Sequence, residues 1–175
     1  MQKILQTESS ECGLACLAMI ANHFGYQADI ADLRRKFSIS LKGATLAQLM
    51  RHASSLELSS RPLRLDLDEI DQLAPPCILH WNLNHFVVLA KVGRKTVTIL
   101  DPAIGERKLT LAEVSRHFTG VALELTPTAD FKPQAAAPRL SLRSLTGRVT
   151  GLWRSLAQIF AVAAVLELFV IVAPL

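Results

Sequence analysis

The spacing of apolar residues changes near residue 76, and this change constrains the fold more than any other feature of the sequence. Before it, apolar residues recur at helical spacing. After it, short runs rich in β-branched residues are separated by turn residues. Helices followed by strands that tight turns connect are typical of an α+β domain. The sequence therefore predicts an α+β fold for residues 1–130, with N-terminal helices packed on an antiparallel sheet.

Helices are predicted over residues 11–24, 30–37, 46–56 and 68–73. Ser9 or Ser10 is placed to cap the first of these helices, and Gly25 stands where a helix commonly ends. Thr45 and Thr110 each begin a capping box, and the second box predicts a helix that ends near Gly120. Strands are predicted over 78–81, 85–92, 97–101 and 121–126, with a tight turn at 93–94.

The net charge of +4 is confined to one part of the chain. Residues 1–130 contain 14 basic and 14 acidic residues, whereas residues 131–175 contain five basic residues and one acidic residue. The body has no basic stripe with interleaved aromatic residues, which argues against a nucleic-acid partner. Three cysteines, an odd number without framework spacing, argue against a disulfide scaffold and favour a reducing compartment.

The C-terminal segment is apolar all round. From Leu156 to Leu175 it has about the length needed to cross the hydrocarbon core of a membrane. Residues 155–175 are therefore predicted to form the first transmembrane helix of a longer protein, in contact with lipid; the alternative is a buried soluble helix. The basic residues precede this segment, so the positive-inside rule predicts a cytoplasmic position for residues 1–154. Residues 131–154 are predicted to be a basic linker.

Cys12 is a candidate nucleophile. It lies in the first turn of the first predicted helix, where unpaired N–H groups and the helix dipole stabilise a thiolate. A cysteine in this position, with a histidine base elsewhere, is typical of nucleophilic catalysis. The alternative is a small buried apolar residue, and Cys16, one turn later, fits that alternative better.

His85 and Asp101 are a candidate base and orienting acid. A hairpin turn centred on Gly93 would place them directly opposite each other, with Cβ atoms about 4.5–5.5 Å apart. The carboxylate then binds one imidazole nitrogen and leaves the other free. A turn centred one residue later pairs His85 with Pro102 instead. The alternative interpretation is a surface ion pair of small energetic consequence.

Two further possibilities concern Gln6 and zinc. The amide of Gln6, six residues before Cys12, can donate a hydrogen bond to a developing oxyanion, although an N-terminal glutamine is commonly solvated.

Two cysteines and two histidines, namely Cys12, Cys16, His80 and His85, also form a possible zinc set. Their spacing on an apolar helix and a strand departs from the usual zinc knuckles, so no metal site is expected.

Three motifs resemble those of one family. Residues 6–20 have the sequence QTESSECGLACLAMI and resemble the cysteine motif of the bacteriocin-processing peptidases. These papain-like domains form the N-terminus of ABC exporters of the colicin V secretion type. Residues 80–89, HWNLNHFVVL, and 101–105, DPAIG, resemble the histidine and aspartate motifs of that family. The resemblance covers residues 4–131 and extends into the apolar segment, and it implies a papain-like cysteine peptidase fold.

The resemblance also implies a function. Cys12 would be the nucleophile, His85 the base, Asp101 the orienting acid and Gln6 the oxyanion donor of a cysteine endopeptidase. Its substrate would be a peptide with a double-glycine leader, and export would follow through an ABC transporter in the bacterial inner membrane. The chain itself would need no cofactor, because ATP would bind a missing C-terminal ATPase domain, and the transporter part would form a homodimer. The alternative is a non-catalytic domain that binds the leader and tethers the cargo.

Overall fold

The computed structural model describes residues 1–37, 43–134 and 152–172 of the chain. The chain divides into two compact units, Met1–Ala137 and Pro138–Leu175. The first unit holds all the described elements except α6 (Leu152–Val172), which belongs to the second. Most of the predicted linker at 131–154 lies outside the described residues, and the predicted boundaries at 130 and 154 stay predictions.

The helices of the first unit follow the predicted spacing. They are η1 (Ser9–Glu11), α1 (Cys12–His23), α2 (Ile30–Lys36), α3 (Leu46–Ser54), η2 (Leu67–Gln72) and α4 (Leu111–Val114). α1 is buried from Cys12 to Ala21, and Gly25 follows it with a φ of +94°, a conformation that glycine adopts without strain. The Thr45 capping box is confirmed, because Gln48 N–H donates to Thr45 Oγ1 and Thr45 N–H donates to Gln48 Oε1.

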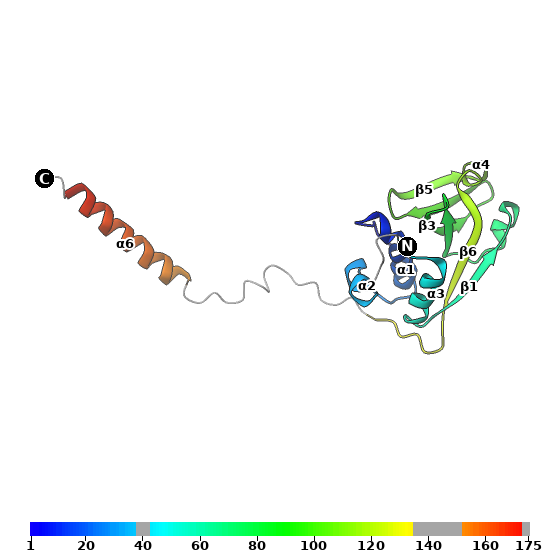
Figure 1. The fold of residues 1–175 in the computed structure, drawn as a ribbon, viewed down its shortest axis with the longest axis horizontal. Coiled ribbons are helices and arrows are strands. Elements are labelled where there is room, and N and C mark those ends of the chain that lie inside the picture. Colours follow the sequence, from blue (N-terminus) through cyan, green and yellow to red (C-terminus); the bar gives the residue numbers. More distant parts are fainter. Residues whose placement is uncertain (38–42, 135–151, 173–175) are drawn as a thin grey trace. The chain divides into compact units, whose positions relative to one another are not determined.

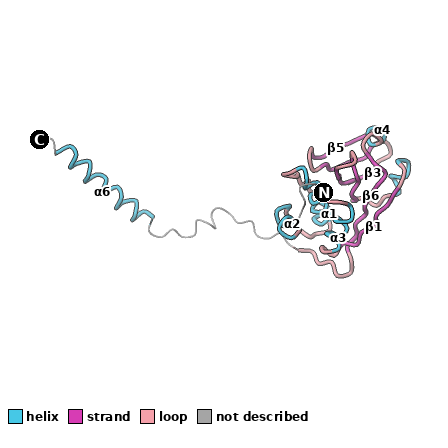
Figure 2. Tube along the Cα trace, viewed as in Figure 1, coloured by secondary structure: helices cyan, strands magenta, loops and turns pink. Residues whose placement is uncertain are grey.

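The strands form one six-stranded antiparallel sheet with the order β1-β6-β2-β3-β4-β5 (Figure 2). They are β1 (Leu58–Arg64), β2 (Cys77–Trp81), β3 (His85–Val92), β4 (Thr96–Asp101), β5 (Gly105–Thr110) and β6 (Phe118–Pro127). β2, β3, β4 and β5 are consecutive and are joined by tight turns. The predicted helices packed on an antiparallel sheet are therefore confirmed.

Both faces of the sheet are covered. α1 lies against β2 and β3 on one face (Figure 1). Phe86 and Val88 of β3 belong to the same apolar cluster as the α1 side chains. Val87 and Leu89, which alternate with them, belong to a second cluster with Ile70 of η2. Each large apolar side chain buried in these clusters stabilises the fold by about 1.5–3 kcal/mol.

Two strands were not predicted, and one helix is shorter than predicted. β1 and β5 are the outermost strands, and their sequences LSSRPLR and GERKLT are largely polar and exposed. An edge strand that buries little carries a weak apolar signal and tolerates Pro62, so its sequence resembles a loop. The helix that begins after Thr110 ends at Val114 and not near Gly120, because β6 already begins at Phe118.

α6 is the described part of the predicted transmembrane segment. Its side chains from Trp153 to Phe169 are exposed, including Ile159, Phe160 and Leu168. Among the residues that the structure describes, no helix is long and apolar enough to cross a membrane, so the predicted span is not supported there. The predicted segment continues through 173–175, which lie outside the described residues.

Candidate active site

Cys12 is the first residue of α1 and is 4% exposed. The predicted caps, Ser9 and Ser10, do not cap α1; they lie in η1, the 3₁₀ turn that leads into it. The carboxylate of Glu11 instead caps η1. Its Oε2 accepts hydrogen bonds from the N–H groups of Thr7 (3.2 Å) and Glu8 (3.1 Å). The backbone before the thiol is therefore held by a buried carboxylate and not by a serine hydroxyl.

His85 and Asp101 lie together at one end of the sheet. His85 is the first residue of β3 and Asp101 is the last of the antiparallel neighbour β4, so the two strands bring them to the same end. The distance from His85 Nε2 to Asp101 Oδ1 is 2.9 Å, and the side chains are 17% and 5% exposed. Asp101 Oδ1 also accepts a hydrogen bond from Ala103 N–H at 2.9 Å. The predicted contact between the two residues is confirmed.

The predicted register of this contact is wrong. Val88 pairs with Leu100, and continuing that register places Val87 opposite Asp101, so His85 contacts Asp101 diagonally. Nearer the turn, Lys91 pairs with Thr98, and the register shifts at Ala90, which is the extra residue of a β-bulge. If the register near the turn continued through Ala90 without a bulge, Asp101 would lie opposite Val88. Its side chain would then project from the face opposite that of His85.

The turn before His85 has an unusual backbone. Asn82 and Leu83 have φ values of 50° and 64°, and the side chain of Leu83 is 81% exposed. A leucine in this left-handed region costs about 1 kcal/mol. His117, which directly precedes β6, supports the turn, because its ring stacks on Trp81 and its Nδ1 lies 2.8 Å from Asn82 Oδ1. Sequence analysis did not identify His117, which no local pattern connects with the turn.

The pKa values of His85 and Asp101 are shifted in opposite directions. The hydrogen bond to Asp101 and then the interaction with the Cys12 thiol raise the pKa of His85 to about 9, although burial lowers it. Burial raises the pKa of Asp101, but the hydrogen bonds from His85 and Ala103 together outweigh it and leave the pKa below its usual value. The structure thus places His85 in contact with Asp101, and the Cys12 thiol lies close enough to His85 to raise the pKa of the imidazole.

Gln6 is attached to the same site through its backbone. Its N–H donates a hydrogen bond of 2.9 Å to the carbonyl oxygen of Pro102, the residue after Asp101. Its side-chain Oε1 is buried and has no hydrogen-bond partner among the described residues. A buried polar atom without a partner needs an explanation, and a bound substrate is one. The backbone link to Pro102 was not predicted, because it joins two loops far apart in the sequence.

The other two cysteines are in different surroundings. Cys16 and Cys77 are both fully buried, and neither forms a disulfide. Burial raises the pKa of Cys16 well above its usual value, and it raises the pKa of Cys77 to about 12. The interpretation of Cys16 as a small buried apolar residue is therefore confirmed, and Cys77 is of the same kind.

No group of three or more histidine, cysteine, aspartate or glutamate side chains within the described ranges is arranged to hold a metal ion. His80, a member of the possible zinc set, instead places its Nδ1 2.7 Å from the hydroxyl of Thr119.

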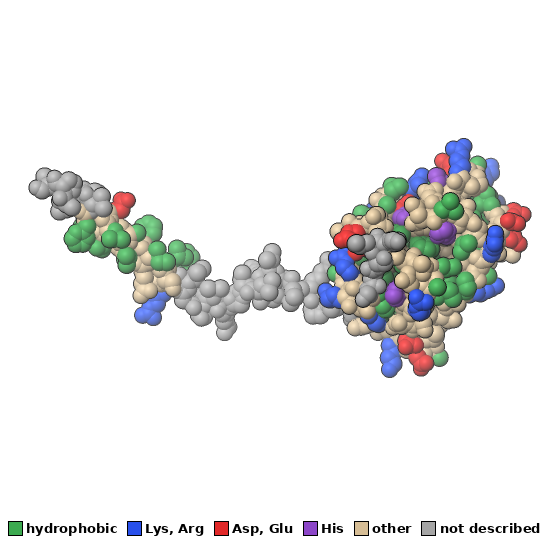
Figure 3. All heavy atoms as spheres, in the orientation of Figure 1, with side chains coloured by type: hydrophobic (Ala, Val, Ile, Leu, Met, Phe, Trp, Pro, Cys, Tyr) green, Lys and Arg blue, Asp and Glu red, His purple; other side chains and the backbone are tan. Residues whose placement is uncertain are grey.

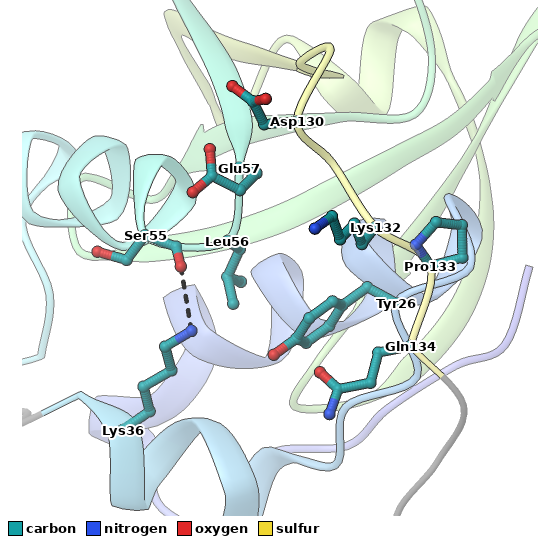
Figure 4. A pocket seen from close by; sticks show the side chains of 9 residues that line it. All are labelled: Tyr26, Lys36, Ser55, Leu56, Glu57, Asp130, Lys132, Pro133 and Gln134. Atoms are coloured by element: carbon teal, nitrogen blue, oxygen red, sulfur yellow. Dashed lines mark hydrogen bonds between the residues drawn. The ribbon is translucent and has the colours of Figure 1, made fainter.

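The pocket in Figure 4, of about 500 Å³, lies between α2, α3 and the chain after β6. Its lining includes Tyr26, Lys36 and Lys132 but none of the four candidate site residues.

The surface of the first unit carries mixed charges. Basic and acidic side chains are interspersed on the face that Figure 3 shows, in agreement with the balance of 14 against 14 over residues 1–130. Ion pairs in this unit include Arg61 with the buried Glu124 and Arg35 with Asp32. The charge distribution therefore gives the first unit no large basic surface on that face.

Comparison with known proteins identifies the family. Residues 1–130 match the model of the peptidase C39 family. The chain belongs to this family. As a C39 peptidase it is a cysteine peptidase, which agrees with the sequence resemblance to the bacteriocin-processing peptidases.

Two curated relatives of this C39 peptidase come from Escherichia coli. The colicin V secretion/processing ATP-binding protein is 50% identical over 164 residues, which are 94% of this chain and 24% of that protein. The probable microcin-H47 secretion/processing ATP-binding protein is 48% identical over 171 residues, which are 98% of this chain and 24% of that protein. The chain thus spans about a quarter of the length of these relatives.

Solved structures show the same fold. A double glycine motif protease from an AMS/PCAT transporter, in complex with the leader peptide, has a TM-score of 0.69 and 34% identity. The match covers 73% of this C39 chain and 91% of that one. The peptidase domain of Streptococcus ComA, a bi-functional ABC transporter, has a TM-score of 0.67 and 26% identity, with 73% and 98% of the two chains covered.

Proposed function

We propose that this C39 peptidase cleaves a leader peptide after a double-glycine motif, or a glycine-alanine or glycine-serine variant, in a bacteriocin-like precursor. Cys12 is the nucleophile, His85 the base, Asp101 the orienting acid and Gln6 the oxyanion donor. The observation that carries the proposal is the 2.9 Å contact between His85 Nε2 and Asp101 Oδ1, beside a Cys12 thiol that is close enough to raise the pKa of His85. A papain-like cysteine peptidase needs this arrangement.

The reaction is acyl transfer in two steps. Because Nε2 of His85 contacts Asp101, Nδ1 is the nitrogen that takes the thiol proton. The Cys12 sulfur attacks the carbonyl carbon of the second small residue, and the resulting oxyanion accepts hydrogen bonds from Gln6 Nε2 and the Cys12 backbone N–H. His85 then protonates the leaving amine, the C–N bond breaks and a thioester remains. Water, deprotonated by His85, attacks the thioester carbonyl. The C–S bond then breaks, His85 returns the proton to the Cys12 sulfur, and the leader leaves with a new carboxyl group.

Two observations support a leader peptide with an apolar face as the substrate. The related double glycine motif protease was solved with a leader peptide, and the relatives in Escherichia coli are named for secretion and processing. In addition, Leu5, Leu83 and Ile104 expose 54%, 81% and 68% of their surface, and each is within three residues of a proposed site residue. Apolar side chains around the site suit a peptide with an apolar face, and glycine at the cut lets the backbone approach a buried thiol.

We also propose that the peptidase is coupled to export. The relatives are ATP-binding proteins by name, and the chain covers about a quarter of their length. The proposal assigns ATP binding to a part of the protein other than residues 1–175. In this proposal the apolar segment 155–175 contributes to the membrane part of a homodimeric transporter. The basic residues before it keep the peptidase on the cytoplasmic side of the bacterial inner membrane. Extraction of the membrane fraction with alkaline carbonate tests this attachment, because a chain released by carbonate would contradict it.

The proposed activity can be tested with synthetic peptides. The 175-residue chain is mixed with a leader peptide that ends in Gly-Gly followed by several cargo residues, and mass spectrometry locates the cut. We expect one cut after the second glycine, and at least about 100-fold slower cleavage when that glycine is replaced by valine. The Cys12→Ala variant should bind the peptide without cleaving it. Binding without cleavage by the unmodified chain would instead favour the non-catalytic leader-binding domain.

A further inference from the structure

Glu11 is a buried carboxylate for which the proposed reaction gives no role. It is 2% exposed and directly precedes Cys12 in the chain. The other buried acidic residues in the described part of the chain are Asp101, which contacts His85, and Glu124, which contacts Arg61 and Ala74 N–H. A buried carboxylate is costly unless it is paired and hydrogen-bonded, so the partners of Glu11 indicate what it holds.

The two oxygens of Glu11 have different partners. Oε1 accepts a hydrogen bond from Arg34 Nε at 2.6 Å, and the Nη2 of the same guanidinium also contacts it. Oε2 accepts from the N–H groups of Thr7 and Glu8. The carboxylate thus links the guanidinium of α2 with the backbone that immediately follows Gln6. Charge-assisted hydrogen bonds of this kind are about twice as strong as neutral ones.

The segment from Gln6 to Cys12 is therefore fixed at both ends. At one end, Gln6 N–H is bonded to Pro102, next to Asp101. At the other end, Glu11 holds the backbone of Thr7 and Glu8 and is covalently joined to Cys12. The half-buried side chain of Gln6, with its unpartnered Oε1, lies on this segment.

We infer that Glu11 and Arg34 form a positioning pair that sets the place of the Gln6 amide relative to the Cys12 sulfur. The pair acts through the backbone of residues 6–8 and touches neither substrate nor the reacting atoms. This inference rests on the proposed function, since it concerns the oxyanion that forms during peptide cleavage. It predicts that loss of the pair slows acylation while substrate binding and the reactivity of the thiol stay nearly the same.

The first test uses Glu11→Gln and Arg34→Gln with a double-glycine leader peptide. For each variant, kcat should fall by roughly 10- to 100-fold, the loss expected for a misplacement of about 1 Å, with KM changed less than about 3-fold. The rate of Cys12 alkylation by iodoacetamide, which forms no oxyanion, should change less than about 3-fold. Arg34→Lys, which keeps the charge but loses the planar fork, should restore part of kcat.

Arg35→Gln is the matched control. It removes the same charge from the next position of α2, where Arg35 pairs with the exposed Asp32. Its kcat should equal that of the unmodified chain. Circular dichroism and urea unfolding of all variants show whether each is folded, and Arg34→Gln keeps the test usable if Glu11→Gln does not fold. A loss of kcat in Arg35→Gln equal to that in Arg34→Gln would overturn the inference.

A double-mutant cycle with Gln6→Ala gives the decisive comparison. Gln6→Ala alone should lower kcat by about 10²–10³-fold, as for loss of one oxyanion donor. If Glu11 acts through Gln6, Glu11→Gln should cost less than about 3-fold more in the Gln6→Ala background. Fully multiplicative losses would overturn the inference and leave the proposed peptidase intact. Absence of cleavage by the unmodified chain would instead contradict the proposed function.

Discussion

His85 and Asp101 contact each other diagonally across β3 and β4, at 2.9 Å between Nε2 and Oδ1. The extra residue Ala90 in β3 keeps the two side chains on the same face of the strand pair. A bulge next to an active site commonly re-aims a side chain in this way. In the observed hairpin, the bulge that sets this register lies five positions away from the histidine. It gives the imidazole a fixed orientation and leaves Nδ1 free of the carboxylate.

Replacement of Asp101 by asparagine should uncouple His85 from its orienting group. The amide cannot stabilise the imidazolium as the carboxylate does, so the pKa of His85 should fall from about 9 towards its ordinary value of 6.5. Cleavage should slow by about 10²–10⁴-fold because the ring loses its fixed tautomer and orientation. NMR titration of the His85 ring protons measures the pKa. An unchanged pKa in Asp101→Asn would contradict the assigned hydrogen bond.

The raised pKa of His85 also predicts how stability depends on pH. A histidine with a pKa of 6.5 when unfolded and about 9 when folded stabilises the fold in its protonated form. The contribution is complete below pH 6.5 and is lost as the pH rises through 9. The difference in free energy of unfolding between the unmodified chain and His85→Gln should therefore shrink from pH 6.5 to 9.5. In the Asp101→Asn background, the free-energy difference caused by His85→Gln should vary less with pH. An equal variation there would contradict the assignment of the raised His85 pKa to the hydrogen bond with Asp101.

The three cysteines should differ in reactivity. Burial raises the pKa of Cys16 and of Cys77, so few of these thiols are ionised at neutral pH, and neither is accessible. At pH 7, iodoacetamide should modify Cys12 at least about 10-fold faster than the other two. Peptide mapping of timed samples measures the three rates. In 8 M urea the three rates should converge, and equally slow modification of all three in the folded chain would favour the non-catalytic domain.

Glu124 gives a test of the fold away from the site. Its Oε1 accepts a hydrogen bond from Ala74 N–H at 2.8 Å, and its Oε2 contacts Arg61. Glu124→Ala should lower the free energy of unfolding by roughly 1–3 kcal/mol because a part-buried N–H loses its acceptor. Glu124→Gln keeps an acceptor and should cost less. Urea unfolding measures both values, and equal losses in the two variants would show that the Ala74 bond contributes little.

Strong local signals predicted much of the fold and the contact between His85 and Asp101. The apolar run from Leu14 to Ala21 and the Thr45 capping box identified α1 and α3, and the strand limits at His85 and Asp101 brought these residues to one end of the sheet. β1 and β5 escaped prediction because edge strands carry polar residues.

Other features of the site depend on contacts that a sequence pattern does not record. The pairing register of β3 and β4 shifts at Ala90. The sequence does not predict this shift, because hairpin turns centred one or two residues apart contain nearly the same residues. The bond from Gln6 N–H to Pro102 and the pair of Glu11 with Arg34 join segments 96 and 23 positions apart. Such contacts form only when the sheet and the helices have packed together.

Covalent capture tests most directly whether Cys12 carries the reaction. The chain is mixed with an ester of a double-glycine leader, quenched in acid after a short time and digested for mass spectrometry. We predict an adduct at Cys12 whose added mass is the leader acid minus one water. It should form before the free leader accumulates and be absent in Cys12→Ala, which should release no leader. An adduct at another residue, or leader release by Cys12→Ala at the rate of the unmodified chain, would contradict the assignment.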